Sequence, residues 1–193
     1  MKKSERILFA LVCLALVLEV MLIPGSGILL VLSFTALTCV YMFGGLFLFN
    51  GIPLRRVFRE GAFSEVSKGK VVGAMGAGVA LSLTTIGLLF RFQSWPGADF
   101  LLATGLLLLL VVLIIGAVKY LQSKTSYYVG IFLRASVIGG LGLIMMLAPS
   151  TAWVEIIYRN HPAYLDAFKK AVADPDNQEL WEKVREERQK IDR

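Results

Sequence analysis

Histidine and cysteine are nearly absent from this 193-residue sequence, which has one of the first and two of the second. His161 has no companion carboxylates, so we interpret it as an ordinary surface residue. Cys13 and Cys39 lie inside apolar runs without the spacing of metal ligands, so we expect packing residues rather than a disulfide or a metal site. Because the sequence shows no Ser/His/Asp set either, it predicts neither enzyme activity nor a bound metal or cofactor.

Charge is also scarce, because charged side chains make up 18% of the chain and apolar ones 56%, whereas a soluble domain carries about 25% charged residues. Residues 1–150 hold 12 of the 20 Lys and Arg but only 5 of the 14 Asp and Glu. An excess of bases can indicate nucleic-acid binding. Here the bases lie in short segments between apolar runs, where they orient helices in a bilayer, so we expect lipid and not nucleic acid around the chain.

Five apolar runs predict five membrane-spanning helices, in residues 7–23, 28–49, 71–90, 100–118 and 127–148. Each run is close to the ~20 residues that a bilayer requires, and lipid offers no partner for free backbone groups, which favours helices. The first run has a basic start like a signal peptide, but no small-residue cleavage site follows it. The predicted fold is an all-α membrane protein, with a transmembrane bundle in residues 1–149 and an extramembrane helical tail in residues 150–193.

Lysine and arginine are distributed unequally between the two predicted membrane faces. Ten of them flank the spans on one face, and the two turns on the opposite face hold only Arg91. The ten are Lys2, Lys3, Arg6, Arg55, Arg56, Arg59, Lys68, Lys70, Lys119 and Lys124. By the positive-inside rule, the N-terminus is predicted to be cytoplasmic and the tail periplasmic.

The tail has the pattern of two amphipathic helices. Pro162 suits the first turn of one helix, and Asp176 with Glu179 resembles a capping box at the start of the next. Their apolar positions are Tyr164, Leu165, Phe168 and Val172, and then Leu180, Trp181, Val184 and Ile191. We expect this pair to fold on itself, on the membrane surface or on a partner.

The stretch GLLFRFQSWPGADFLLATG predicts a helical hairpin that turns at a membrane surface around Trp95, Pro96 and Gly97. Tryptophan is common at such surfaces. A weaker copy, LEVMLIPGSGILLVLSF, lies 72 positions earlier, where Pro24 and Gly25 align with Pro96 and Gly97. Either the two hairpins arose by duplication in one orientation, or membrane hairpins simply tend to share Pro-Gly turns and leucines.

Small residues line one face of the third predicted span, at Gly73, Ala77, Ala80, Thr84 and Gly87. The fifth span repeats the pattern at Ala135, Gly139 and Gly142. Small faces let helices pack closely in lipid. The contact is either inside the bundle or between two copies of the chain.

Glu19, Arg91 and Arg134 are charges inside or at the ends of the predicted spans. A charge at the bilayer centre costs at least ~2.5–3.5 kcal/mol, so each needs a reason. One interpretation is a proton or ion relay. The other is structural, with Glu19 paired to Arg91 or Arg134. Because Glu19 and Arg91 occupy equivalent positions of the two hairpins, we predict a pair between them, with Arg134 as the second choice.

The run GLLFRFQSWPGADFLLATGLL resembles the transmembrane hairpin of gliding-motility proteins of the GldL type, and a broader set of Bacteroidetes membrane proteins with a similar turn. The resemblance covers about residues 84–112 and implies a helical hairpin in a bacterial inner membrane. In GldL-type proteins that hairpin forms the stator of a proton-driven motor. It has a lysine after the first span, which Arg91 matches. The second-span glutamate falls near Leu109 here, and Ser94 replaces the turn histidine.

Together these features predict a multi-pass protein of a bacterial inner membrane that is not an enzyme. The leading hypothesis is a scaffold or assembly subunit of a cell-envelope complex. Its partner is then a membrane or envelope protein, or a second copy of the chain. The alternative is a small transporter or proton-conducting subunit that uses Glu19, Arg91 and Arg134.

Overall fold

The computed structural model describes residues 2–52 and 66–191, and every regular element in these two ranges is a helix. The long helices are α1 (Lys2–Val20), α2 (Ser26–Asn50), α4 (Lys68–Phe92), α5 (Ala98–Ser123) and α6 (Ser126–Leu147). The tail holds α7 (Ala152–Ile157), α8 (Pro162–Ala173) and α9 (Gln178–Ile191). The predicted basic segment with Arg55, Arg56 and Arg59 lies outside the described residues.

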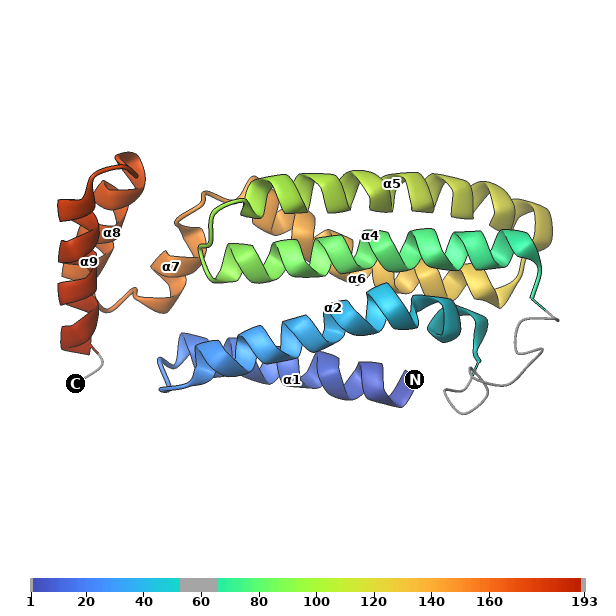
Figure 1. Ribbon diagram of the computed structural model, residues 1–193, viewed down its shortest axis with the longest axis horizontal. Helices are drawn as coiled ribbons and strands as arrows, with labels where there is room; N and C mark the ends of the chain where they lie inside the picture. The colour runs from blue at the N-terminus through green and yellow to red at the C-terminus, as the bar shows by residue number, and fades with distance from the viewer. Residues whose placement is uncertain (1, 53–65, 192–193) are drawn as a thin grey trace.

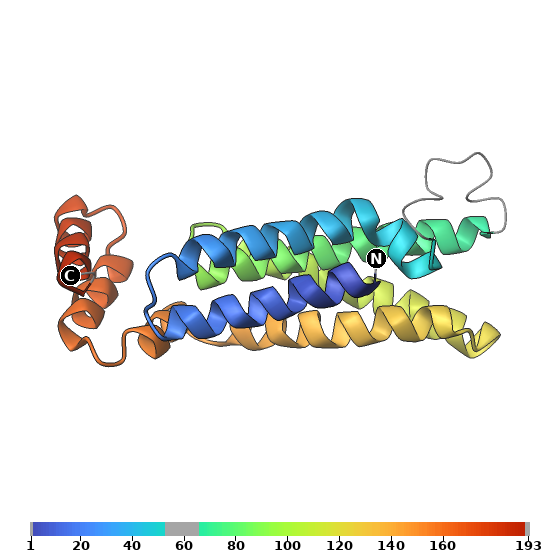
Figure 2. The ribbon, with the colours of Figure 1, turned by 90° about the horizontal axis from the view of Figure 1, so that it is seen from below.

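The long helices run up and down in one bundle, joined by turns at its two ends (Figure 1). α4 lies in the middle and packs against α2, α5 and α6. α1 packs against α2, and the view from below shows it between α2 and α6 (Figure 2). The core lies where these helices meet, and it is built mainly of leucine, at Leu30, Leu37, Leu81, Leu88, Leu89 and Leu102.

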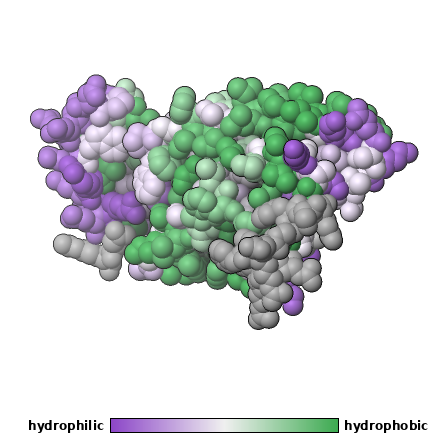
Figure 3. All heavy atoms as spheres, turned by 45° about the vertical axis from the view of Figure 1, so that its right-hand side comes forward, coloured by the Kyte–Doolittle hydropathy of each residue, from purple (hydrophilic) through white to green (hydrophobic). Residues whose placement is uncertain are grey.

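Four helices, α2, α4, α5 and α6, are long and apolar enough to cross a membrane. Hydrophobic side chains cover the middle of the molecule, and hydrophilic ones gather towards its two ends (Figure 3). An apolar surface of this extent marks a membrane or partner contact rather than a water-facing surface. α1 is not among the four, because five of its 19 residues are charged. The all-α fold is therefore confirmed for the described residues, and four of the five predicted spans are helices suited to crossing a membrane by length and composition.

The two hairpin turns have the same backbone geometry. Gly25 and Gly97 both have φ of +86°, and Leu22 and Ser94, three residues earlier in each turn, have φ of +55° and +54°. The backbone N–H of the following residue, Ile23 or Trp95, donates to the carbonyl oxygen five residues earlier, at 3.1 Å and 2.8 Å. Helices commonly end in this way, with one residue in the left-handed conformation. Trp95 is 40% exposed, as a membrane-surface turn requires. The predicted turn between two helices is confirmed, while its place at a membrane surface and an origin by duplication stay predictions.

The tail helices α8 and α9 fold on each other, which is one of the three alternatives that the sequence leaves open, and they lie beyond the end of the bundle that holds these two turns (Figure 1). Tyr164 and Phe168 of α8 and Val184 of α9 are buried. The ring of Phe168 meets that of Trp181 edge to face, with 6.1 Å between centroids. The two apolar stripes of the sequence are therefore the contact between these helices.

Helix α7 attaches the tail to the bundle. The ring of Trp153 packs edge-on against Phe92 of α4, with 4.7 Å between centroids. Lys169 Nζ of α8 lies 3.0 Å from Glu155 Oε1 of α7. Hydrogen bonds from Lys169 and from Thr151 hold the pKa of Glu155 below its ordinary value. The tail is thus connected to the bundle by packing as well as by the chain.

Candidate functional site in the helix bundle

A buried ion pair joins α1 to α6. The side chains of Glu5 and Arg134 are 10% and 16% exposed. Nε and Nη2 of Arg134 each lie 2.5 Å from a different carboxylate oxygen of Glu5. Two parallel charge-assisted hydrogen bonds are among the stronger polar contacts in proteins. Each charge is therefore compensated although water is largely excluded.

A third helix joins this pair. The Tyr41 hydroxyl of α2 donates to Glu5 Oε1 at 3.0 Å. Nη1 of Arg134 donates to the carbonyl oxygen of Gly130 at 2.7 Å, and the guanidinium carbon lies 5.4 Å from the centre of the Phe49 ring, within cation–π range. A cavity of about 430 Å³ opens beside these groups. The cluster of Glu5, Tyr41 and Arg134 therefore ties α1, α2 and α6 together at one point.

The sequence pattern does not single out Glu5. Glu5 stands between Lys3 and Arg6, so it resembles part of a solvated basic flank. In the structure α1 begins at Lys2, part way along the bundle (Figure 2), and this brings Glu5 to the level of Arg134. One feature of the sequence could have identified Glu5. It is an acid in the first turn of its helix, and that helix is predicted to start at the same membrane face as the helix that carries Arg134.

Arg91, in the last turn of α4, is held by its own hairpin. Nη1 of Arg91 lies 2.7 Å from Oδ1 of Asp99, which stands in the first turn of α5. Nη2 donates to the carbonyl oxygen of Ala148, just after α6, at 2.7 Å. Because Asp99 and Ala148 occupy the guanidinium, the Glu19–Arg91 pair that the sequence predicts is not formed. Arg91 instead joins the ends of three helices.

Glu19 also bonds within its own hairpin, where its carboxylate accepts a hydrogen bond from the Ser26 hydroxyl at 2.6 Å. A Cβ placed on Gly27 would lie 3.7 Å from Oε2 of Glu19 and 3.8 Å from Nε2 of Gln93. That Gln93 nitrogen is buried and has no hydrogen-bond partner among the described residues. None of the ion pairs in the described ranges includes Glu19.

The charged groups therefore form separate clusters towards the two ends of the bundle. Glu5 and Glu19 are fourteen positions apart on α1, which is about 21 Å along a helix. The buried side chains of Val12 and Ala15 lie between them. Thr84, buried on α4, donates its hydroxyl hydrogen to the Ala80 carbonyl of its own helix at 2.9 Å. The structure does not bring Glu19, Arg91 and Arg134 together as one network.

The small residues predicted on α4 lie at a helix contact, with one exception. Ala77 and Ala80 are fully buried. Gly73 is exposed. Among the described residues, the only atom within 4 Å of a Cβ placed on Gly73 is the Tyr127 hydroxyl oxygen, at 3.4 Å. Among the predicted residues the packing face therefore begins at Ala77, because Gly73 lines an open groove between α4, α5 and α6 instead of a helix contact.

The small residues predicted on α6 face α4 and α5. A Cβ on Gly139 would lie 3.3 Å from Cδ1 of Leu109, and one on Gly142 would lie 3.0 Å from Cγ2 of Thr84. Ala135 is buried as well. These residues serve packing inside the bundle, which is one of the two alternatives that the sequence leaves open.

The closest helix contacts involve two glycines that the sequence does not single out. A Cβ on Gly78 of α4 would lie 2.6 Å from the backbone oxygen of Tyr41, and one on Gly105 of α5 would lie 2.6 Å from the backbone nitrogen of Thr84. Only a residue without a side chain allows backbones this close. Gly78 and Gly105 therefore fix how α2 and α5 sit against α4.

No protein-family model, curated protein or solved structure matches this chain. The resemblance to GldL-type hairpins stays a prediction. Leu109, near the position of their second-span glutamate, is 2% exposed and packs in the apolar core. Within residues 2–52 and 66–191 no three His, Cys, Asp or Glu side chains lie together as metal ligands would.

Proposed function

We propose that α1 is a fifth membrane crossing and that the protein resides in a bacterial inner membrane. α1 has 19 residues, about 28 Å at 1.5 Å per residue, close to the ~30 Å hydrocarbon core of a bilayer. Its hairpin with α2 turns as the α4–α5 hairpin does. Arg134 neutralises Glu5, which lowers the cost of placing this charged helix in lipid.

The charge of the bundle ends supports the predicted orientation. Lys68 and Lys70 begin α4, and Lys119 and Lys124 stand at the α5–α6 connection. These lysines lie at one end of the bundle and the tail lies beyond the other (Figure 1). By the positive-inside rule the lysine-bearing end is cytoplasmic and the tail periplasmic.

The function that this geometry supports best is that of a non-enzymatic scaffold or assembly subunit of a cell-envelope complex. The observation that carries the proposal is the tail, a folded helix pair held to the bundle by α7. Its last helix exposes charges of both signs, at Glu182, Lys183, Arg185 and Glu186. A positioned surface of this kind suits recognition of a protein of complementary charge. The bundle then serves as the anchor, and its partner is another envelope protein or a second copy of the chain.

A proton- or ion-conducting subunit is the second candidate. The hydrogen-bonded cluster of Glu5, Tyr41 and Arg134 beside a cavity of about 430 Å³ favours it, because such groups occur in proton relays. The apolar stretch of about 21 Å between Glu5 and Glu19, where the buried Val12 and Ala15 offer no polar group, argues against it. We therefore rank the scaffold first.

The size of the assembly in mild detergent tests the scaffold. The native protein is expected to migrate as a complex larger than one chain. Glu182→Lys with Glu186→Lys should reduce that size, because both side chains are exposed on α9 and their reversal changes the charge of the tail surface without touching its buried contact. Glu19→Gln is the matched control, and it should leave the complex intact.

Reconstitution into liposomes distinguishes the two candidates. A scaffold should dissipate an imposed pH gradient no faster than protein-free liposomes. The proton-conducting role is supported over the scaffold if the native protein dissipates the gradient, if Glu5→Gln abolishes that dissipation, and if the tail variant keeps its full assembly size.

A further inference from the structure

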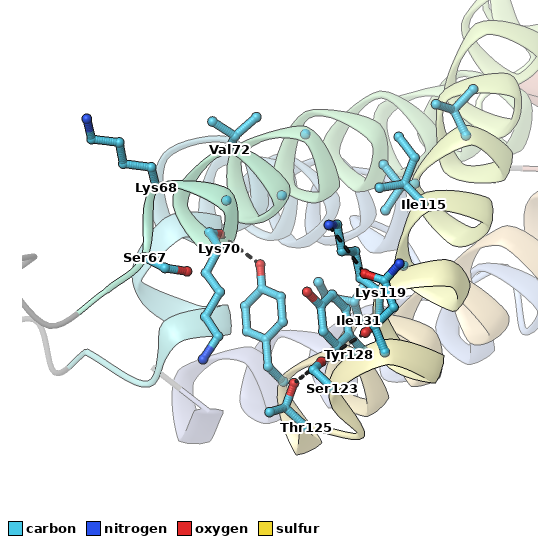
Figure 4. A pocket seen from close by; sticks show the side chains of 18 of the residues that line it. Ser67, Lys68, Lys70, Val72, Ile115, Lys119, Ser123, Thr125, Tyr128 and Ile131 are labelled. Atoms are coloured by element: carbon cyan, nitrogen blue, oxygen red, sulfur yellow. Dashed lines mark hydrogen bonds between the residues drawn. The ribbon is translucent and has the colours of Figure 1, made fainter.

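We propose that an anionic phospholipid binds in a groove between α4, α5 and α6 at the lysine-bearing end of the bundle. The groove has a volume of about 1060 Å³, and side chains of all three helices line it (Figure 4). This inference rests on the membrane insertion proposed above and is independent of the scaffold role.

The walls of the groove are apolar, and the groove is open along the side of the bundle. Val72 of α4 and Ile115 of α5 line it and remain 69% and 57% exposed. The α4 wall also includes Gly76, where an added Cβ would meet no atom of the described residues within 4 Å. The missing side chain leaves room along the helix. A molecule that enters from the surrounding lipid can therefore lie against both walls.

Basic side chains stand at the mouth of the groove. Lys70 comes from the α4 wall and Lys119 from the α5 wall, whereas the side chain of Lys68 points away from the groove (Figure 4). Lys119 Nζ lies 3.5 Å from Oε1 of Gln122, and Lys70 Nζ lies 6.0 Å from the centre of the Tyr127 ring. Among the ion pairs of the described residues none includes these lysines. Their charge is thus available to an anion.

The length of the groove fits one leaflet. Its α4 wall runs from Ser67 to Val79, which is about 18 Å at 1.5 Å per residue, and one leaflet contributes about 15 Å of hydrocarbon. The positive charge lies only at the end where the headgroups of that leaflet belong. An anionic phospholipid matches both features, with its phosphate at Lys70 and Lys119 and an acyl chain along the apolar walls.

Native mass spectrometry of the full chain tests the groove. The detergent-solubilised protein is offered equal amounts of phosphatidylglycerol and phosphatidylcholine with identical acyl chains. We expect phosphatidylglycerol to be retained preferentially, by about fivefold for each lysine that contacts the headgroup. Lys70→Gln with Lys119→Gln should bring the ratio close to one. Lys3→Gln with Lys124→Gln removes the same charge from residues that do not line the groove, and it should leave the ratio unchanged.

A second variant tests the apolar walls. Gly76→Leu fills the groove without meeting protein atoms at its Cβ, so it should lower phosphatidylglycerol retention severalfold. Soluble glycerol phosphate should not bind, because it lacks the acyl chains. The proposal fails if the native protein retains both lipids equally, if the control pair lowers the ratio as much as the groove pair, if Gly76→Leu keeps its lipid, or if glycerol phosphate binds. Failure of membrane insertion itself is seen separately, by accessibility labelling.

Discussion

Arg134→Met is expected to lower the free energy of unfolding by about 3–5 kcal/mol, because it leaves the Glu5 carboxylate charged, buried and without its cation. Glu5 is 8% exposed as a residue and loses both 2.5 Å hydrogen bonds from the guanidinium. Methionine fills most of the space of the arginine stem, so the charge and not the volume dominates the loss. Unfolding of the purified protein in one fixed detergent would measure it.

The double variant Glu5→Gln with Arg134→Met tests whether the unpaired charge causes the loss of stability. It removes both charges and keeps an oxygen that can accept the Tyr41 hydroxyl, so it should be clearly more stable than Arg134→Met alone. Arg6→Met is the matched control, because Arg6 is an exposed arginine of α1 next to Glu5, and its effect should stay within about 0.5 kcal/mol. If Arg134→Met is as mild as that control, the ion pair does not hold α1 to α6.

Gly105→Leu should destabilise by about 3 kcal/mol, at the upper end of the usual cost of overpacking. A Cβ at this position would lie 2.6 Å from the backbone nitrogen and 2.8 Å from Cα of Thr84. Backbone atoms cannot turn aside as a flexible side chain does, so α5 has to move away from α4. Gly140→Leu on α6 is the control, because a Cβ there would meet nothing within 4 Å and leucine favours helix over glycine. Equal stability of the two variants would contradict the close α4–α5 contact.

Helix positions were predictable because the apolar runs are long and the turns carry Pro-Gly. The span predicted at residues 28–49 is the helix Ser26–Asn50. The span predicted at residues 100–118 is longer in the structure, Ala98–Ser123. The apolar run marks only the part suited to lipid. The helix itself continues through Lys119 until Lys124 takes a left-handed conformation, with φ of +47°.

Partners of the charged residues were not predictable for a different reason. Glu5 and Arg134 are 129 positions apart, and their meeting depends on where α1 begins relative to α6. Glu19 and Arg91 occupy equivalent positions in the sequence, but each side chain finds a partner in its own hairpin, Ser26 for Glu19 and Asp99 for Arg91. Arg91 also bonds to Ala148 after α6. The turn already holds such local partners close together, so pairing them requires no further loop to be closed.

The tightly packed glycines show the same limit. The membrane helices are apolar on every side, so the periodicity of the sequence does not reveal which face meets a neighbour. A row of small residues predicted the α4 face correctly at Ala77 and Ala80. Gly78, the next residue after Ala77, faces α2. A Cβ there would lie only 2.6 Å from the backbone oxygen of Tyr41, so this helix contact is among the closest in the bundle.

The central claim, five crossings with the tail outside, is tested most directly by cysteine labelling with a membrane-impermeant maleimide. Single cysteines replace Ser4, Ser67 and Gln189, all exposed, in a background that lacks Cys13 and Cys39. In spheroplasts, the account predicts that Gln189→Cys is labelled at once, and that Ser4→Cys and Ser67→Cys are labelled only after permeabilisation. Labelling of Ser4→Cys and Ser67→Cys from opposite faces would show that α1 does not cross. Labelling of Ser67→Cys and Gln189→Cys from the same face would contradict the three crossings between them.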